Sequence, residues 1–263
     1  MLDSLAEKVN WRVRNWERQR RHTWLTAGWT RARQLFHNRR DRGKINRLPK
    51  FLDENVFPRD VASAVHAICE GEQGQGIRPM QLEPELNSLI SLIRDRKPTT
   101  VLEIGTARGG TLCLLCRFAA PEATIVSVDL PYGRNGGGYP RWKEAYYRLF
   151  PLPEQTLHLI RANSHATETV AKVAQAIGGR SFDFILIDAD HSYEGVKTDF
   201  RLYAPLIAKN GLIALHDVLP NIGDPSIDVN RFWDELTSKP DQKTSTLTSY
   251  ADQKAFGIGL VYP

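Results

Sequence analysis

The chain has 263 residues, of which 41% are apolar and 25% are charged. This length allows one large domain or one domain with an appendage, and the composition excludes a wholly disordered chain. Three cysteines are too few for a disulfide framework, and no apolar run is long enough to span a bilayer. We therefore expect a cytoplasmic protein.

Positive charge is concentrated near the N-terminus. Residues 1–50 carry 14 Lys and Arg against 4 Asp and Glu (a balance of +10), whereas residues 51–263 carry 21 against 26 (a balance of −5). Four of the six tryptophans also lie within residues 1–50. This distribution argues against a nucleic-acid-binding protein, because the basic character belongs to the appendage and not to the main body.

The basic, Trp-rich segment over 1–50 has helical periodicity. Its apolar side chains recur at steps of three and four residues, with arginines on the other sides; the apolar positions are Leu2, Leu5, Val9, Val13 and Trp16. Three roles stay open for this helical extension. It could contact the inner membrane surface or an anionic glycolipid, pack on a second copy in a homo-oligomer, or form a solvated arm.

The next segments lead into the main domain. Residues 38–49 have the composition of a polar connector, and residues 51–98 form a predicted helical lead-in with one helix over 77–96. Over 99–263, short apolar runs alternate with helical segments; the runs cover 100–104, 124–128, 157–160, 182–187 and 212–215. This alternation predicts a Rossmann-like, doubly wound α/β sheet of seven strands. A C-terminal antiparallel hairpin over 244–247 and 256–261 completes it.

A glycine-rich loop follows the first predicted strand, in the sequence Glu103-Ile104-Gly105-Thr106-Ala107-Arg108-Gly109-Gly110-Thr111. Glycines at this place let a ligand approach the backbone, and the next helix offers free N–H groups to a negative group. The spacing differs from that of dinucleotide sites, which disfavours a nicotinamide cofactor. The second strand ends at Asp129, where a carboxylate can accept hydrogen bonds from a ribose. A tight turn and a helix cap are the structural alternatives.

Carboxylates and histidines follow the fourth and fifth predicted strands. Asp188 and His191 come directly after residues 182–187, and His216 and Asp217 come at the end of the next strand. Asp188, His216 and Asp217 could converge on one cation, for which Mg²⁺ or Mn²⁺ is the expected metal. His191 is close enough to Asp188 to act as a general base. Helix capping at the loop starts is the structural alternative.

The ordered motifs E-I-G-T-x-x-G-G-T, V-D-L, I-D-A-D-H-S-Y-E-G-V-K and N-G-L-I-A-L-H-D-V resemble those of class I S-adenosylmethionine-dependent methyltransferases. Within this superfamily, the chain resembles the bacterial small-molecule O-methyltransferases that include macrolide-sugar and polysaccharide-sugar methyltransferases. The resemblance covers about residues 77–240. It implies an enzyme that binds S-adenosylmethionine and methylates a hydroxyl of a small molecule or glycan.

The resemblance also implies a role for each matching residue. Eight residues would bind the cofactor, from its methionine end to its adenine: Glu103, Gly105, Thr106, Gly109, Thr111, Asp129, Asn163 and Ser164. Asp188 would be a metal ligand and His191 the base, since sugar methyltransferases carry His where catechol-type enzymes carry Lys. The family has an acidic or acid–amide pair after the fifth strand. Here the pair is His216-Asp217, a departure that favours Asp217 as the ligand.

Several readings stay open at this stage. Residues 132–142 form either a substrate lid, in which Tyr139 and Trp142 stack on a sugar, or a plain surface loop. Cys113 and Cys116 are expected to pack in the core. The acceptor is expected to be a sugar hydroxyl; the alternatives are a phenolic or catechol-like acceptor, or a non-catalytic protein that binds the cofactor or a glycan.

Overall fold

The computed structural model describes residues 42–131, 138–221, 223–224 and 226–263, so the helix predicted within 1–36 lies outside the described residues. The polar connector expected over 38–49 is wrong in its described part. Residues 42–45 are helical, and helix α3 spans Leu48–Phe51. The apolar side chains of Ile45 and Leu48 are buried in the main hydrophobic cluster, which explains why this part folds against the body.

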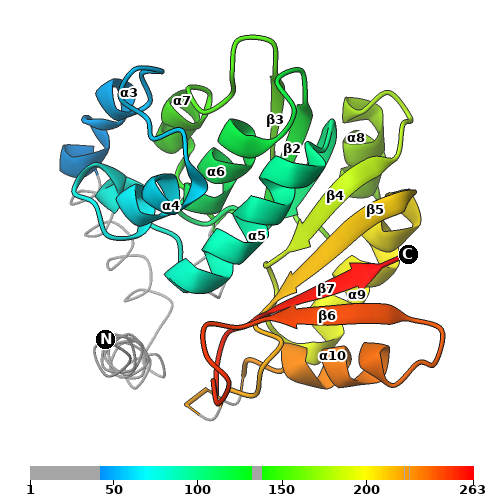
Figure 1. Cartoon of the computed structure of the whole chain (residues 1–263). Coiled ribbons are helices and arrows are strands. Elements are labelled where there is room, and N and C mark those ends of the chain that lie inside the picture. The colour runs from blue at the N-terminus through cyan, green and yellow to red at the C-terminus, as the bar shows by residue number, and fades with distance from the viewer. Residues whose placement is uncertain (1–41, 132–137, 222, 225) are drawn as a thin grey trace, which may run out of the picture.

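Seven strands form one sheet in the order β3-β2-β1-β4-β5-β7-β6 (Figure 1). Their bounds are β1 Thr100–Ile104, β2 Thr124–Asp129, β3 Thr156–Arg161, β4 Phe182–Ile187, β5 Ile207–His216, β6 Lys243–Leu247 and β7 Ile258–Tyr262. The first five strands pair in parallel, and β7 is antiparallel to both β5 and β6. The predicted Rossmann-like sheet with its C-terminal hairpin is therefore confirmed.

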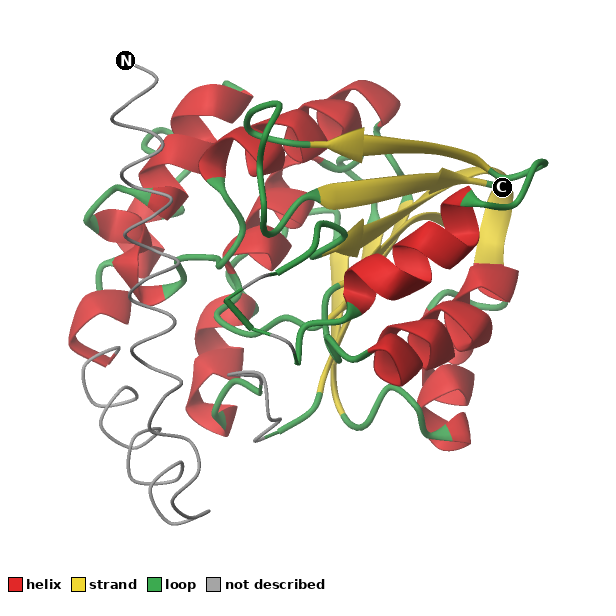
Figure 2. Cartoon of the chain, turned by 90° about the horizontal axis from the view of Figure 1, so that it is seen from below, coloured by secondary structure: helices red, strands yellow, loops and turns green. Residues whose placement is uncertain are grey.

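Helices cover both faces of this sheet (Figures 1 and 2). The longer ones are α4 Val61–Cys69, α5 Glu83–Arg96, α6 Gly110–Phe118, α8 Thr167–Ala176, α9 Tyr193–Tyr203 and α10 Val229–Thr237. Shorter turns are α7 Glu144–Tyr147 and the 3₁₀ segments Gln73–Gly76, Arg141–Lys143 and Ala204–Leu206. Strand side chains alternate between the faces: Val101 packs with α4, α5 and α6, whereas Leu102 and Ile104 pack with α8, α9 and α10.

Helix α5 starts later than its apolar pattern predicts. Residues 77–82 are irregular, and Pro84 takes a position in the first helical turn, where its missing N–H has no helical partner to lose. The irregular segment lies against the start of α6, because a Cβ on Gly110 would stand only 2.4 Å from the carbonyl oxygen of Ile77. Cys113 and Cys116 are buried in α6, as expected, and burial raises the pKa of Cys113 to about 12.

The strand order fixes where a ligand can bind. The chain builds β1, β2 and β3 in one direction and then returns to place β4 on the other side of β1. Loops that leave the carboxyl ends of β1 and β4 therefore run to opposite sides, which is the usual location of ligand sites in open α/β sheets. No helix among the described residues is long and apolar enough to cross a membrane.

Candidate active site

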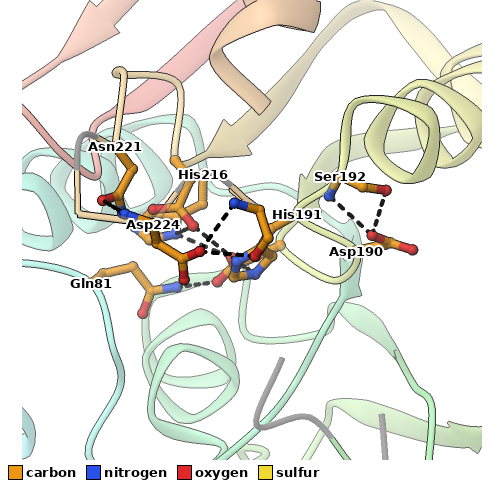
Figure 3. A network of polar contacts seen from close by, with 10 residues as sticks. Gln81, Asp190, His191, Ser192, His216, Asn221 and Asp224 are labelled. Carbon is orange, nitrogen blue, oxygen red and sulfur yellow. Dashed lines mark hydrogen bonds and ion pairs between the residues drawn. The ribbon is translucent and has the colours of Figure 1, made fainter. Parts of the chain in front are cut away.

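Four titratable side chains meet at the carboxyl ends of β4 and β5 (Figure 3). The Nδ1 atom of His216 lies 3.1 Å from Asp188 Oδ1 and 3.5 Å from Asp217 Oδ2. His191 contacts the same two carboxylates, with Nδ1 3.1 Å from Asp217 Oδ2 and Nε2 3.6 Å from Asp188 Oδ1. The structure thus brings together the four residues that the sequence placed at two neighbouring strand ends.

Backbone geometry explains why these side chains point inward. The N–H of Asp188 donates to the carbonyl of Ile104 at 2.8 Å, which ties the end of β4 to the end of β1. Asp217 has a left-handed backbone with φ of 62°, a conformation that Asp tolerates better than most residues. Such strained positions cluster at functional sites, where surrounding contacts hold them in place.

The charged groups of this cluster shift one another's pKa values. Burial by itself would lower the pKa of His216, but the carboxylates of Asp217 and Asp188 raise it well above its usual range. Burial likewise opposes the ionisation of Asp217, yet the neighbouring His216 and His191 rings lower the pKa of that carboxyl to about 2. The cluster therefore favours an ionised Asp217 and the protonated form of His216.

The donor set fits a divalent cation. Ligand atoms of Asp188, His191 and Asp217 all lie within 4.8 Å of one another. His216 Nδ1 contacts the same carboxylates, so either imidazole can complete a set of two carboxylates and one nitrogen. Such a set suits Mn²⁺ or another transition metal better than Mg²⁺, which prefers oxygen ligands alone. The chosen ligand set, Asp188 with His216 and Asp217, stays a prediction.

Asp190 has a structural role instead. Its Oδ1 accepts hydrogen bonds from the Ser192 N–H at 3.0 Å and the Ser192 hydroxyl at 2.8 Å, and Figure 3 shows this pair turned away from the histidines. Ser192 in turn caps α9 by accepting from the N–H of Gly195. The capping alternative thus describes Asp190, while Asp188 two residues earlier belongs to the cluster.

The glycine loop lies directly beside this cluster. Gly105 has φ of 98°, and a Cβ there would stand 2.0 Å from the carbonyl oxygen of Asp188. Gly109 has φ of 91°, and its Cβ would meet the ring of Tyr147 at 2.7 Å. Both glycines are therefore required by the fold itself, whatever the loop binds.

Glu103 on β1 is the strongest sign of a ligand near the loop. The side chain is fully buried, and neither carboxylate oxygen meets the geometry of a hydrogen bond to a described residue. The nearby Thr106 hydroxyl nevertheless favours the ionised form of this carboxyl. Burial raises the pKa of this carboxyl well above its usual range. A buried carboxylate without partners is costly, and an ammonium group of a ligand would satisfy it.

The other predicted cofactor residues have partners within the chain. Thr106 bonds to Ser127, and the Thr111 hydroxyl donates to Gln81 Oε1 at 3.1 Å. Asn163 accepts from the N–H of His165 at 3.0 Å. The buried Ser164 carbonyl accepts from the Tyr203 hydroxyl at 2.7 Å. Their contacts with a cofactor stay predictions.

Asp129 lies at the end of β2, where a ribose-binding acid is expected. Its Oδ2 accepts from the N–H groups of Ala107 at 3.0 Å and Tyr139 at 3.3 Å, and its Oδ1 accepts from Gly138 at 3.2 Å. Burial raises its pKa to about 6. A bidentate grip on a ribose would require the Gly138 and Tyr139 donors to give way to the sugar hydroxyls.

Tyr139 does not present its ring to a sugar in this structure. The residue is only 2% exposed, and its ring packs edge-on against Tyr147 at a centroid distance of 4.8 Å. The guanidinium of Arg161 lies 5.4 Å from the same ring. Trp142 is half-buried against Tyr146. The predicted stacking role is therefore wrong for Tyr139 as it stands here, and residues 132–137 of the proposed lid lie outside the described residues.

Sequence reasoning missed two polar residues of the helical lead-in. Gln81 donates from Nε2 to Asp188 Oδ2 at 2.5 Å, and Glu85 on α5 is fully buried near His216. Glu85 Oε1 accepts from the N–H of Gly257 at 3.1 Å and from the Gln253 amide. Only the position of Glu85 on the apolar side of α5, next to Leu86 and Leu89, could have marked it as unusual.

Glu85 should make stability depend on pH. Burial raises its pKa from an ordinary 4.5 to about 7, so its favourable contribution is present below pH 4.5 and is lost as the pH rises through 7. Glu85→Gln should therefore raise the free energy of unfolding at pH 8.5, by at most about 3 kcal/mol. The difference in free energy of unfolding between the variant and wild type should be smaller at pH 5. Urea denaturation at both pH values measures it, and an equal effect at both would contradict the assignment.

Comparisons with known proteins support this picture. Residues 102–218 match the sequence model of a family described as "Methyltransferase domain". An uncharacterized protein y4gI of Sinorhizobium fredii is 23% identical over 150 residues, which are 56% of this chain and 16% of that protein. A ribosomal RNA large subunit methyltransferase E of Methanobrevibacter smithii is 28% identical over 113 residues, 43% of this chain and 45% of that protein. The chain thus matches less than half the length of either relative.

Solved structures share the fold. A putative caffeoyl-CoA O-methyltransferase from Staphylococcus aureus has a TM-score of 0.54 at 16% identity, over 76% of this chain and 92% of that one. An O-methyltransferase from Bacillus cereus in complex with SAH has a TM-score of 0.53 at 16% identity, over 81% of this chain and 96% of that one. The O-methyltransferase TomG from Streptomyces achromogenes, in complex with SAM, has a TM-score of 0.51 at 16% identity, over 77% of this chain and 89% of that one.

These findings agree with the predicted methyltransferase fold and with the motifs that the sequence carries. The match over 102–218 contains the glycine loop, Asp129, Asp188, His191, His216 and Asp217. Residues 102–218 are therefore similar to a methyltransferase domain, and the chain has the fold of these solved O-methyltransferase structures.

Proposed function

We propose that this protein transfers a methyl group from S-adenosylmethionine to a hydroxyl of a sugar, in a glycoside or a surface polysaccharide. The observation that carries the proposal is the cluster of Asp188, His191, His216 and Asp217 beside the glycine loop after β1. A base and a donor set for a cation, set next to a cofactor loop, are what hydroxyl activation for methyl transfer needs.

The cofactor would lie along the carboxyl ends of β1 and β2. Glu103, whose oxygens do not meet the geometry of a hydrogen bond to a described residue, would accept hydrogen bonds from the ammonium of the methionine end. Thr111 at the start of α6 would lie near the carboxylate, where helix N–H groups favour negative charge. Asp129 would accept from the ribose hydroxyls, with Asn163 and Ser164 nearer the adenine.

His191 is placed to take the acceptor proton. Asp217 Oδ2 lies 3.1 Å from His191 Nδ1, so this carboxylate favours the tautomer with the proton on Nδ1. The Nε2 atom is then left to accept a proton from the acceptor hydroxyl. In the same step the acceptor oxygen bonds to the methyl carbon, the sulfur–methyl bond breaks, and S-adenosylhomocysteine leaves.

Asp188, Asp217 and one imidazole would hold a divalent cation. When bound, such a cation lowers the pKa of a coordinated hydroxyl and orients it toward the methyl group. We assign the imidazole ligand to His216, because the assignment leaves His191 free to act as base. Two vicinal hydroxyls of a sugar suit such a site, and sugar methyltransferases of the resembled group carry His at the position of His191.

Calorimetric titration tests this function. Wild-type protein is titrated with S-adenosylmethionine and with S-adenosylhomocysteine, each with EDTA and with added Mn²⁺ or Mg²⁺. We expect cofactor binding and a separate metal isotherm that is lost in Asp188→Asn. Cofactor binding without metal would leave His191 as the sole activating group, and no cofactor binding would overturn the proposal. An acceptor screen of glycosides and catechols then separates the sugar reading from the phenolic one.

Metal affinity should increase with pH. The protonated form of His216 is favoured because its pKa is raised well above the usual range, and an imidazolium cannot coordinate a metal. Titration of Mn²⁺ at pH 6.5 and pH 8.5 should give tighter binding at the higher pH. Proton release should make the measured heat of binding depend on the ionisation heat of the buffer. Affinity that does not change with pH would contradict a His216 that must lose a proton before it binds the metal.

A further inference from the structure

We propose that Gln81 is a positioning residue, which fixes the carboxylate of Asp188 so that one oxygen faces the histidines. The inference rests on the proposed function, because it takes Asp188 as the working carboxylate of the site. Gln81 lies in the irregular segment before α5, 107 residues from Asp188 in sequence and outside the matched methyltransferase region.

The two carboxylate oxygens of Asp188 have different partners. Gln81 Nε2 donates to Asp188 Oδ2 at 2.5 Å. Asp188 Oδ1 is 3.1 Å from His216 Nδ1 and 3.6 Å from His191 Nε2. With Oδ2 held by an amide, Oδ1 is the oxygen presented to the site.

The other end of the Gln81 amide is anchored as well. Its Oε1 accepts from the Thr111 hydroxyl at 3.1 Å, so both ends of the amide have partners and its orientation is fixed by their chemistry. The Asp188 carboxylate can only accept, so it needs the NH₂ group of Gln81. If the amide were flipped, its oxygen would face the Asp188 carboxylate and this hydrogen bond would be lost. Gln81 thus links the start of α6, beside the cofactor loop, to Asp188.

Packing holds the Gln81 backbone in register. Gln81 is buried, and the segment before it lies against Gly110, whose Cβ would stand 2.7 Å from the Pro79 ring. Leu82, the next residue, is also buried. A buried side chain on a packed segment holds its partner in one orientation better than an exposed one, and partners of metal ligands contribute about 10- to 100-fold in metal affinity.

Gln81→Met is the variant that tests this role, because it keeps the length of the side chain and removes both hydrogen bonds. Gln155→Met is its matched control. Gln155 is also buried, and its Nε2 donates to the carbonyls of Cys116 and Ala120, away from the site. The probes are Mn²⁺ alone, followed by electron paramagnetic resonance, and S-adenosylhomocysteine, followed by calorimetry. Gln81→Asn, which is too short to reach Asp188, replaces Gln81→Met if that variant does not fold.

We expect Gln81→Met to weaken Mn²⁺ binding about tenfold while S-adenosylhomocysteine affinity stays within about twofold of wild type. Gln155→Met should change neither. A crystal structure of Gln81→Met should show the Asp188 carboxylate rotated from its wild-type position. Unchanged Mn²⁺ affinity, or an unmoved carboxylate, overturns the proposal.

Failure of the proposed function has a different signature. If the wild-type protein binds no Mn²⁺, the metal part of that function fails. The orientation of Asp188 in the two crystal structures then decides the role of Gln81 alone: a rotated carboxylate supports it, and an unmoved one overturns it. If wild type binds Mn²⁺ and Asp188→Asn does not, the metal part of that function stands whatever Gln81→Met shows.

Discussion

Asp188→Asn should lower methyl transfer by about 10²- to 10³-fold while leaving S-adenosylmethionine affinity nearly unchanged. The substitution keeps the shape of the side chain but removes the charge that faces both imidazoles, with Oδ1 3.1 Å from His216 Nδ1. It should also abolish the metal isotherm, because one of the two carboxylates is lost. Single-turnover rates with labelled cofactor, together with calorimetry, measure both effects.

Asp190→Asn is the matched control. Asp190 lies in the same loop as Asp188 and carries the same charge, but its carboxylate accepts hydrogen bonds from Ser192 outside the cluster. The variant should therefore keep near wild-type turnover. His191→Ala separates the two nitrogen assignments. Turnover should fall while the metal isotherm remains if His216 is the ligand, whereas loss of the isotherm would make His191 the ligand. Full turnover in Asp188→Asn would contradict the site assignment.

The sheet could be predicted because its strands are buried on both faces. Residues 182–187 are apolar except for Asp183, as is typical of a strand covered on both faces, and the structure puts β4 there with the same bounds. Boundaries set by local packing were harder. The start of α5 depends on Gly110 and on the proline at 84, and the helix at 42–45 depends on burial of Ile45 against distant residues.

The core of the candidate site was also predictable, since parallel strands present their carboxyl ends at one edge. Asp188 and the His216-Asp217 pair follow adjacent strands, so their proximity follows from the order of β4 and β5. The partners of these residues were not predictable. Gln81 reaches Asp188 from residues 77–82, which the sequence placed in a helix but which are irregular. Tyr139 is buried although its glycine-rich neighbours suggested an exposed loop.

The glycine loop after β1 and the residue that carries the Asp188 carboxylate are in contact through their backbones. Gly105 is the first residue after β1, and it lies so close to the end of β4 that a side chain would overlap the Asp188 carbonyl. The same Asp188 donates its N–H to Ile104, the residue before Gly105. A change at Gly105 must therefore move Asp188, the loop, or both.

Gly105→Ala should destabilise the protein by about 3 kcal/mol or more and remove both cofactor and metal binding. The new Cβ would stand 2.0 Å from Asp188 O and 2.9 Å from Ala189 N, and these backbone atoms cannot move without displacing the end of β4. The φ of 98° adds strain for any residue with a side chain. Urea denaturation gives the stability change, and calorimetry with S-adenosylhomocysteine and Mn²⁺ gives the binding changes.

Gly178→Ala separates the two causes. Gly178 also has a positive φ, of 62°, but a Cβ there would meet no atom within 4 Å. It should lose only the backbone contribution, about 1 kcal/mol, and keep cofactor and metal binding. If Gly105→Ala were no more destabilising than Gly178→Ala, the close contact between the glycine loop and Asp188 would be wrong.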